Sequence, residues 1–258
     1  MPYCDNRGVR IHYHLEGNPD GTPLVLQVGF SLSLQDWHEV GYVAALGGHH
    51  RLILVDARGH GGSDKPHDPT AYRDHLMADD VLAVLDHLGI AQARFFGYSM
   101  GARIGFALAT RAPHRFRALV FGGGDPADAD PTETDAGEDL LRRGAAAFVD
   151  AAEGWFGPRM TPSLRARMLR NDAEALLARS RSSHAERPGY ERTLPRVAVP
   201  CLFFAGDADL PYHDRAKAVS ARMARASFVS LPGLNHMEGL CRVDLVAPYV
   251  LAFLATVP

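Results

Sequence analysis

The chain has 258 residues, of which 47% are hydrophobic and 22% charged, a composition that can bury a substantial core. Its 27 basic and 30 acidic residues give a formal charge of −3, so it lacks the basic surface that attracts nucleic acid or anionic lipid. No stretch approaches the roughly 20 apolar residues of a membrane span, and we expect neither nucleic acid nor membrane as a partner.

The cysteines indicate a reducing compartment. Cys4, Cys201 and Cys241 are too few and too widely spaced for a disulfide framework or a zinc site. The opening sequence MPYCDNRGVR has no apolar run before a small-residue cleavage site, which a secretory signal would have. The sequence therefore predicts a cytoplasmic protein with reduced thiols.

Strand patterns begin at residues 9–16, where apolar and polar side chains alternate. This alternation is typical of a strand with one buried face, and we expect it to be antiparallel and near a sheet edge. Later runs are short and almost continuously apolar, as in strands buried on both faces of a parallel sheet. These runs cover residues 23–29, 51–57, 94–99, 118–124, 200–207 and 227–233.

Helical patterns lie between these runs. One covers residues 72–88 and stops at Gly89, and another follows Ser99 and ends before Pro113. A third covers about 244–256, with Pro248 near its first turn. Its expected apolar stripe consists of Tyr249, Val250, Phe253 and Leu254. The alternation of strand and helix predicts a right-handed, doubly wound α/β sheet.

The alternation stops between about residues 125 and 195. Residues 125–139 carry seven acids, no base and two prolines, which predicts a mobile or solvated connector. Residues 140–192 have a helical pattern, with Trp155 and Phe156 as apolar anchors. They are also rich in arginine, at positions Arg142, Arg143, Arg159, Arg165, Arg167, Arg170, Arg179 and Arg181. We expect this segment to form a small helical lid over the sheet.

The motif Gly97-Tyr98-Ser99-Met100-Gly101 lies directly between a buried strand run and a helical pattern. In this context a G-x-S-x-G motif forms a sharp turn that presents the serine hydroxyl at the carboxyl edge of the sheet. Side chains two residues before and after the serine would collide there, so both positions are glycine. The motif predicts Ser99 as a nucleophile that faces the N-terminus of the following helix.

A serine nucleophile needs a base within hydrogen-bond reach, and that base needs an acid to orient it. Among 13 histidines, His236 is the best candidate because it follows the last apolar run, at the same sheet edge as Ser99. Several others lie within or beside strands and helices, where we expect surface or packing roles: His12, His14, His49, His50, His75 and His87. The acid should leave the carboxyl end of another strand, and Asp207, Asp209 and Asp125 all satisfy this condition.

Together these features resemble the α/β-hydrolase superfamily, and within it the branch of lid-bearing esterases, lactonases and cofactor-free haloperoxidase-like enzymes. The resemblance covers residues 9–124 and 197–257. It implies a doubly wound, mostly parallel central sheet with a small helical lid inserted after the sixth core strand. The chain then divides into a core of residues 1–124 and 197–258 and a lid with an acidic connector, residues 125–196.

The resemblance also ranks the three acids. In that family the triad acid commonly occupies the last position of a G-x-x-D turn, which here begins at Gly206 and ends at Asp209. It therefore implies Asp209 as the triad acid and leaves Asp207 as a turn residue. Asp125 matches an alternative acid position that some family members use.

Two further loops are similar to loops of that family. Residues 56–64 resemble its D-x-R-G-x-G-x-S loop, whose role is structural, so we assign no catalytic role to His60 or Ser63. We expect Asp56 and Arg58 to form an internal ion pair.

The second loop corresponds to the family's H-G-x turn and reads Val28-Gly29-Phe30 here, with valine where the family usually has histidine. In the family, the amide after that glycine and the amide after the nucleophile form an oxyanion hole. The resemblance therefore implies Phe30 and Met100 as the donors.

The implied activity is hydrolysis of a small-molecule carboxylic ester or lactone by Ser99, His236 and Asp209, with no metal or organic cofactor. A carbon–carbon bond hydrolase or a perhydrolase would use the same triad, and a ligand-binding receptor of the same fold is a third class. Serine at position 99 argues against epoxide hydrolases and haloalkane dehalogenases, whose family nucleophile is aspartate.

Substrate specificity should depend on the loop at residues 30–37 and on the lid. Their apolar side chains favour a hydrophobic acyl pocket, with Leu32, Trp37, Trp155 and Phe156 as candidates. The lid arginines raise a second hypothesis, attraction of an acidic substrate, against the alternative of a solvated helix face.

Overall fold

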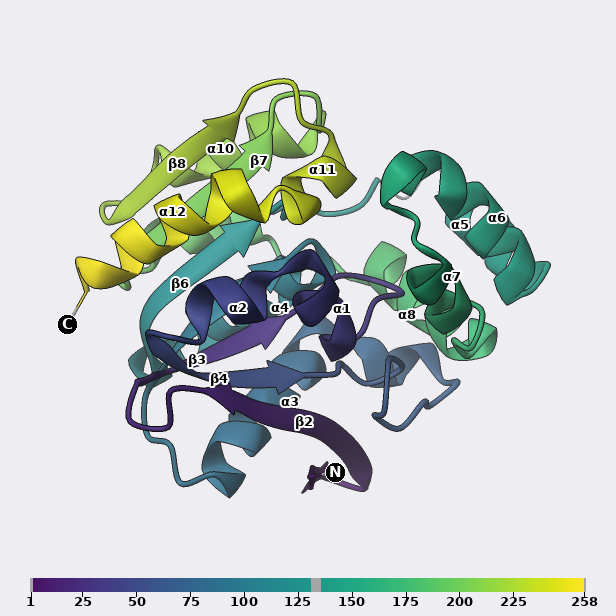
Figure 1. The fold of residues 1–258 in the computed structure, drawn as a ribbon, viewed down its shortest axis with the longest axis horizontal. Coiled ribbons are helices and arrows are strands. Elements are labelled where there is room, and N and C mark those ends of the chain that lie inside the picture. Colours follow the sequence, from purple (N-terminus) through teal and green to yellow (C-terminus); the bar gives the residue numbers. More distant parts are fainter. Residues whose placement is uncertain (1, 131–135, 258) are drawn as a thin grey trace.

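The computed structural model describes residues 2–130 and 136–257. In this part of the chain, eight strands form one sheet in the order β1-β2-β4-β3-β5-β6-β7-β8 (Figure 1). Strands β1 (Tyr3–Asn6) and β2 (Val9–Gly17) pair antiparallel, β2 also pairs antiparallel with β4, and the other pairs are parallel. The predicted mostly parallel sheet and its antiparallel strand near an edge are confirmed.

The parallel strands follow the six apolar runs of the sequence. They are β3 (Thr22–Gln27), β4 (His50–Val55), β5 (Ala93–Tyr98), β6 (Phe116–Gly122), β7 (Cys201–Gly206) and β8 (Ala226–Leu231). Strand β1 was not predicted, because four residues are too few to show a period. The prediction that β8 is buried on both faces is wrong: only Leu231 of that strand is buried, because β8 is an edge strand.

Helices cover both faces of the sheet (Figure 1). One face packs against α3 (Asp74–His87), α4 (Met100–Arg111) and α10 (Tyr212–Ser220). The other packs against α1 (Leu34–Val40), α2 (Tyr42–Leu46), α11 (His236–Cys241) and α12 (Val243–Ala255). Short 3₁₀ turns lie at η1 (Pro69–Tyr72), η2 (Pro113–Arg115), η3 (Gly157–Arg159) and η4 (Leu194–Arg196).

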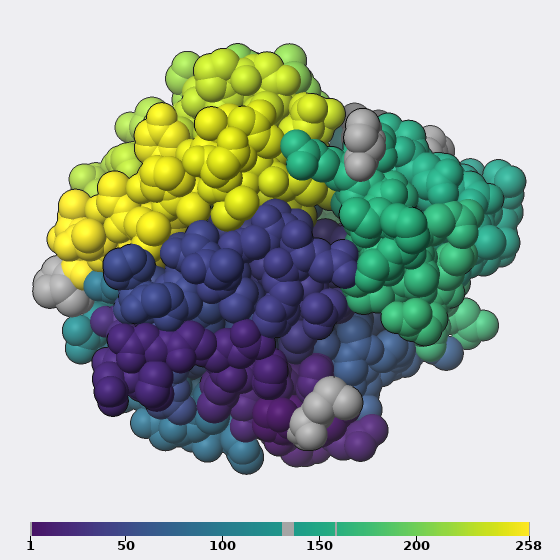
Figure 2. Space-filling model, viewed as in Figure 1, coloured from purple at the N-terminus to yellow at the C-terminus, as the bar shows by residue number. Residues whose placement is uncertain are grey.

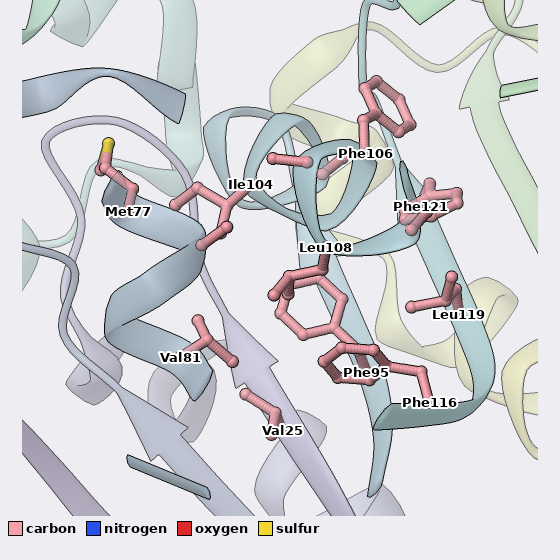
Figure 3. Close-up of a cluster of buried hydrophobic side chains, with 14 of the residues drawn as sticks. Val25, Met77, Val81, Phe95, Ile104, Phe106, Leu108, Phe116, Leu119 and Phe121 are labelled. Atoms are coloured by element: carbon pink, nitrogen blue, oxygen red, sulfur yellow. The ribbon is translucent and has the colours of Figure 1, made fainter. Parts of the chain in front are cut away.

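Each face of the sheet has its own hydrophobic core, because successive side chains along a strand point to opposite faces. Figure 3 shows the α3 and α4 side, where Val81 and Ile104 from the helices and Val25 and Phe95 from the strands belong to one buried cluster, all at most 1% exposed. On β3, Leu24 instead faces the opposite core. Burial of a large apolar side chain contributes about 1.5–3 kcal/mol, so these layers fix the sheet on which the site is built.

Two helical segments depart from the sequence interpretation. The loop expected at residues 30–37 already contains the start of α1, which Ser33 and Asp36 close with a capping box. In α12, Pro248 lies inside the helix rather than in its first turn, and Tyr249 is 52% exposed. The buried stripe of α12 consists instead of Val246, Ala247, Val250 and Leu254.

Asp56 and Arg58, in the loop after β4, do not form the expected ion pair with each other. Each instead pairs with a residue of another element. Asp56 contacts His12 at 2.7 Å rather than Arg58. Arg58 reaches α3, where both oxygens of Asp80 accept hydrogen bonds of 2.6 Å. Asp56 has no room for the guanidinium, because its oxygens also accept the amides of Leu34 and Gly62.

The segment between β6 and β7 contains the inserted helices, α5 to α9, of which α5 to α8 lie at the carboxyl end of the strands (Figure 1). They are α5 (Ala136–Arg142), α6 (Ala145–Phe156), α7 (Pro162–Met168), α8 (Ala173–Ala185) and α9 (Tyr190–Thr193). Figure 2 shows their surface seated against the N-terminal third of the chain and the C-terminal segment. Residues 131–135 of the predicted connector lie outside the described residues, and its last part is helical because α5 begins at Ala136.

Helix length and polarity in the described part of the chain bear on membrane insertion. None of the helices in residues 2–130 and 136–257 is both long enough and apolar enough to cross a bilayer.

The buried Arg58–Asp80 pair predicts a large effect on stability. Replacing Asp80 by Asn leaves the Arg58 guanidinium buried without a compensating charge, and we expect the free energy of unfolding in urea to fall by about 3–5 kcal/mol. The matched control is Asp244→Asn, which breaks an exposed pair with Arg242 and should change stability far less. Equal effects of the two substitutions would contradict the structural role of the buried pair.

Candidate active site

Ser99 occupies a strained turn between β5 and α4. Its φ of 55° and ψ of −115° are rare for a residue with a side chain. Both neighbouring glycines are required by backbone contact: a Cβ at Gly97 would lie 2.3 Å from the carbonyl oxygen of Gly101, and one at Gly101 would lie 1.9 Å from that of Gln27. The turn therefore forces the side chain of Ser99 outward at the carboxyl edge of the sheet.

His236 and Asp209 meet Ser99 from two other loops. The Oγ atom of Ser99 lies 2.9 Å from Nε2 of His236, and Nδ1 of His236 lies 2.7 Å from Oδ2 of Asp209. His236 is the first residue of α11, and Asp209 follows β7 in a turn closed by its amide onto the carbonyl of Gly206. The carboxylate is buried and the imidazole is partly exposed, so the chain of hydrogen bonds runs from the protein interior to an accessible hydroxyl.

The other two candidate acids point elsewhere. Asp207 accepts a hydrogen bond of 2.7 Å from the amide of Gly233. Asp125 forms an ion pair of 2.7 Å with Arg215 on α10. Of the three carboxylates, the structure brings Asp209 to His236.

Tyr98 is a contact residue of this site that the sequence interpretation missed. Its hydroxyl donates a hydrogen bond of 2.5 Å to the backbone carbonyl of His236. Burial, together with the nearby charge of Asp209, raises the pKa of Tyr98 well above its usual value, so the hydroxyl stays protonated and remains a donor. The only sequence signal was its place inside the G-x-S-x-G motif.

The amides of Phe30 and Met100 lie beside Ser99. A Cβ at Gly29 would be 3.2 Å from that of Ser99, so the chain that leads into Phe30 passes directly against the nucleophile. Met100 is the first residue of α4, where a helix amide has no partner within the helix. Among the described residues neither amide donates to another protein group, and both residues line the same cavity as Ser99.

His60 packs against Phe30 and is itself hydrogen-bonded within its own loop. Its Nδ1 contacts the backbone carbonyl of Arg58 at 3.0 Å, and its ring meets the ring of Phe30 edge-on. Burial lowers the pKa of His60 to about 4, so the imidazole is neutral. The Ser63 hydroxyl donates a hydrogen bond to the carbonyl of Asp56. His60 and Ser63 therefore both make hydrogen bonds within the loop of residues 56–64, as expected of a structural role.

A cavity of about 420 Å³ opens beside Ser99. Its two walls differ in polarity. The apolar wall consists of Phe30, Leu141, Phe148 and Trp155, and the polar wall on α8 consists of Arg179, Ser180, Ser183 and His184. An amphiphilic molecule fits such a cavity, with its apolar part toward α5 and α6.

The four predicted pocket residues lie in three different parts of the structure. Trp155 lines the cavity and is half exposed rather than a buried anchor. Leu32 and Phe156 line a separate cavity of about 220 Å³ between α1 and the inserted helices. Trp37 is fully buried against Tyr42 and Phe96 in the core, because α1 turns its indole away from the cavity.

The arginines of the inserted segment lie mainly on outer faces. Arg142 pairs with Glu138, Arg165 with Glu153, and Arg167 with Asp36 and Glu39 of α1. The exception is Arg179, which is 1% exposed, lines the cavity, and donates to Asp74 at 3.0 Å. One arginine of this group therefore belongs to the polar wall, with its guanidinium already paired with Asp74.

The chain is similar in sequence to a family of known proteins. A sequence profile of the family described as "alpha/beta hydrolase fold" matches residues 22–198. The chain is 29% identical over 212 residues to 3-oxoadipate enol-lactonase 2 of Acinetobacter baylyi, a match that covers 78% of this chain and 76% of that protein. It is 36% identical over 117 residues to epoxide hydrolase B of Mycobacterium tuberculosis, covering 44% of this chain and 32% of that protein.

Among solved structures, the chain is similar to the enol-lactonase from Burkholderia xenovorans LB400. The TM-score is 0.87 at 27% sequence identity, and the superposition covers 98% of this chain and 100% of that one.

The close backbone contact at Gly101 predicts that alanine at this position destabilises the protein, whereas alanine at a glycine in open space does not. Gly101→Ala drives a methyl group into the carbonyl of Gln27, and we expect it to lower the free energy of unfolding by about 3 kcal/mol or more. Gly154→Ala is the control, because this helical glycine has open space around it and alanine there should stabilise by about 0.5–1 kcal/mol. Thermal melts of both variants check the prediction, and a neutral Gly101→Ala would refute the contact.

Proposed function

This chain belongs to the alpha/beta hydrolase fold family, and from that premise we propose that it is a serine hydrolase that cleaves a carboxylic ester or lactone through an acyl-enzyme. The observation that carries the proposal is the continuous hydrogen-bonded chain from Asp209 through His236 to Ser99, which ends at a cavity with one apolar wall. A nucleophile, a base and an orienting acid in this arrangement are suited to acyl transfer.

In the first step, His236 removes the hydroxyl proton of Ser99 through Nε2 while Oγ attacks the substrate carbonyl carbon. Asp209 holds the other ring nitrogen, Nδ1, so that Nε2 is free to accept the proton, and it stabilises the imidazolium that forms. The tetrahedral intermediate collapses when the carbon–oxygen bond of the leaving group breaks. His236 returns its proton to that alkoxide oxygen, which leaves an acyl-Ser99 ester.

In the second step, water replaces the departed alcohol. His236 takes a proton from the water as its oxygen attacks the acyl carbon, and the proton then passes to Oγ as the acyl bond to Ser99 breaks. The products are a carboxylic acid and the regenerated serine. For a lactone substrate both halves belong to one molecule, so the product is a single hydroxy acid.

The amides of Phe30 and Met100 serve the same tetrahedral oxygen in both steps. Backbone donors are rigid and need no side chain, which is why Val28 can replace the histidine usual at this turn. One such donor contributes about 3–4 kcal/mol to transition-state stabilisation. The edge-on contact of His60 with Phe30 keeps the loop in place.

The cavity walls support a substrate with an apolar acyl part and a polar remainder. Phe148 and Trp155 would contact the acyl chain, and α8 would face the polar end with Ser183 and Arg179. The similarity to enol-lactonases over most of the chain supports a lactone as one substrate class.

The inserted helices would act as a lid. In this proposal residues 125–196 form the lid, and residues 1–124 and 197–258 form the catalytic core. The location of Leu141, Phe148 and Trp155 in the cavity wall supports this role, because these side chains cover the cavity from the inserted side.

Epoxide opening is the competing chemistry, since one of the similar proteins is an epoxide hydrolase. That reaction class uses an aspartate nucleophile in this superfamily, and here Ser99 stands at the turn. The side chain at the turn therefore favours the acyl-enzyme route.

Substitution of the nucleophile tests the proposed reaction. Ser99→Ala should lower kcat for p-nitrophenyl esters by about 10⁴–10⁶-fold with the fold intact, because the remaining amides cannot supply a nucleophile. The assay uses esters of increasing acyl length, with a simple lactone beside them, and circular dichroism verifies folding. Full activity in the variant would refute Ser99 as the nucleophile, and absence of turnover in the wild-type protein would refute ester hydrolysis.

Substitution of the acid separates Asp209 from its neighbour. Asp209→Asn should lower kcat by about 10⁴-fold, because an amide at this position favours the wrong imidazole tautomer. The control Asp207→Asn removes a carboxylate two residues away that accepts a hydrogen bond from the Gly233 amide, and it should retain most of the activity. Kinetics of both variants on one ester decide the assignment, and the reverse order of effects would transfer the role to Asp207.

A further inference from the structure

A second group of chemically active side chains lies outside the Ser99 cavity, where β2 meets the end of α1. Oε1 of Glu16 is 2.8 Å from Nδ1 of His14 and 3.0 Å from Nε2 of His38. The three potential ligand atoms all lie within 4.8 Å of one another. Among the described residues, this is the one group of three histidine, cysteine or acidic side chains whose ligand atoms converge in this way.

The three residues lie on regular secondary structure, which places their side chains near one another without a bound ligand. His14 and Glu16 are two residues apart on β2, so they project from the same face, and β4 holds their register through Leu54 and Leu52. His38 lies in the last turn of α1, and its carbonyl accepts the amide of Gly41 that closes the helix. Figure 1 shows both elements, β2 and α1, as parts of the core rather than of the inserted segment. Little backbone conformational freedom would be lost on binding a ligand there, because β2 and α1 are already ordered.

The charge environment of Glu16 differs from that of nearby acids. Asp36 and Glu39 on α1 both pair with Arg167. Glu16, in contrast, has only the two imidazoles as ion-pair partners within residues 2–130 and 136–257. A carboxylate whose ion-pair partners are two imidazoles, with no lysine or arginine paired to it in the described part of the chain, offers an oxygen ligand to a cation.

We propose that His14, Glu16 and His38 form a binding site for a divalent transition-metal ion, with Zn²⁺ as the best match. Two imidazole nitrogens and one carboxylate oxygen are a ligand set that zinc accepts. Zinc–ligand bonds of about 2.0–2.2 Å place neighbouring ligand atoms about 3 Å apart, close to the spacings at Glu16. The side chains are 50%, 23% and 29% exposed in the order His14, Glu16 and His38, so water completes the coordination.

The ion would act as a structural link. It would join α1 to β2, and α1 begins just after the loop that carries Phe30. None of the three ligands lines the cavity beside Ser99, so the site is separate from the proposed hydrolysis and its test does not depend on that activity.

The experiment titrates ZnCl₂ into the metal-free full chain by isothermal calorimetry and follows thermal unfolding in parallel. We expect one saturable equivalent in the wild-type protein, and a rise in melting temperature of roughly 5–10 °C at about 100 times the dissociation constant. His14→Ala and His38→Ala should each weaken binding at least about tenfold, since either leaves two ligands. MgCl₂ should not reproduce the effect, because magnesium prefers oxygen ligands.

The matched control is His67→Ala. His67 also touches two carboxylates, Asp172 and Glu174, but it belongs to no converging group of three ligands in the described part of the chain. This variant should bind zinc like the wild type. Zinc binding that survives both His14→Ala and His38→Ala, or its absence in the wild-type protein, would overturn the proposed site.

Discussion

The close approach of the turn at Ser99 to the end of β3 is the constraint on which the rest of the site depends. Gly101 lies so near the carbonyl of Gln27 that no side chain fits between them, and Gly29 passes directly beside Ser99. One backbone contact therefore sets both the outward direction of the serine and the position of the Phe30 amide. The strained φ of Ser99 costs about 1–3 kcal/mol, and burial of Ile104 and other side chains of α4 against the sheet offsets it.

The inserted helices are attached on both sides of that turn. On the side of Phe30, Asn171 donates to the carbonyl of Ser31, and Arg167 bridges to Asp36 on α1. On the opposite side, the buried Arg179 of α8 pairs with Asp74 at the start of α3. These contacts join the inserted helices both to the segment that follows Phe30 and to the start of α3.

The sequence predicted β2, the six parallel strands, three helices of the core and a helical insertion, because strands and amphipathic helices leave recognisable hydrophobic patterns. It also gave Ser99 and His236 as candidates, because the motif and its strand-to-helix context are local. Partners across the fold were less predictable. Nothing local indicates that Arg58 reaches Asp80 on α3 rather than Asp56, or that Trp37 turns into the core. Three of the four predicted pocket residues, Leu32, Trp37 and Phe156, lie outside the Ser99 cavity for the same reason, since any apolar side chain near a site is equally suited to the core.

Tyr98 shows how the fold joins residues from distant parts of the chain into one geometry. It is the residue before Ser99, and its hydroxyl donates to the carbonyl of His236. The strand that carries the serine thus also holds the backbone that carries the imidazole, and a Cβ at Gly239 would lie 2.7 Å from that hydroxyl, so α11 is seated directly upon it. Because burial raises the pKa of Tyr98 well above its usual value, the hydroxyl stays protonated and keeps donating this hydrogen bond. The 2.9 Å contact between Ser99 and His236 is therefore supported by the Tyr98 hydrogen bond one residue away, in addition to the one that Asp209 accepts from His236.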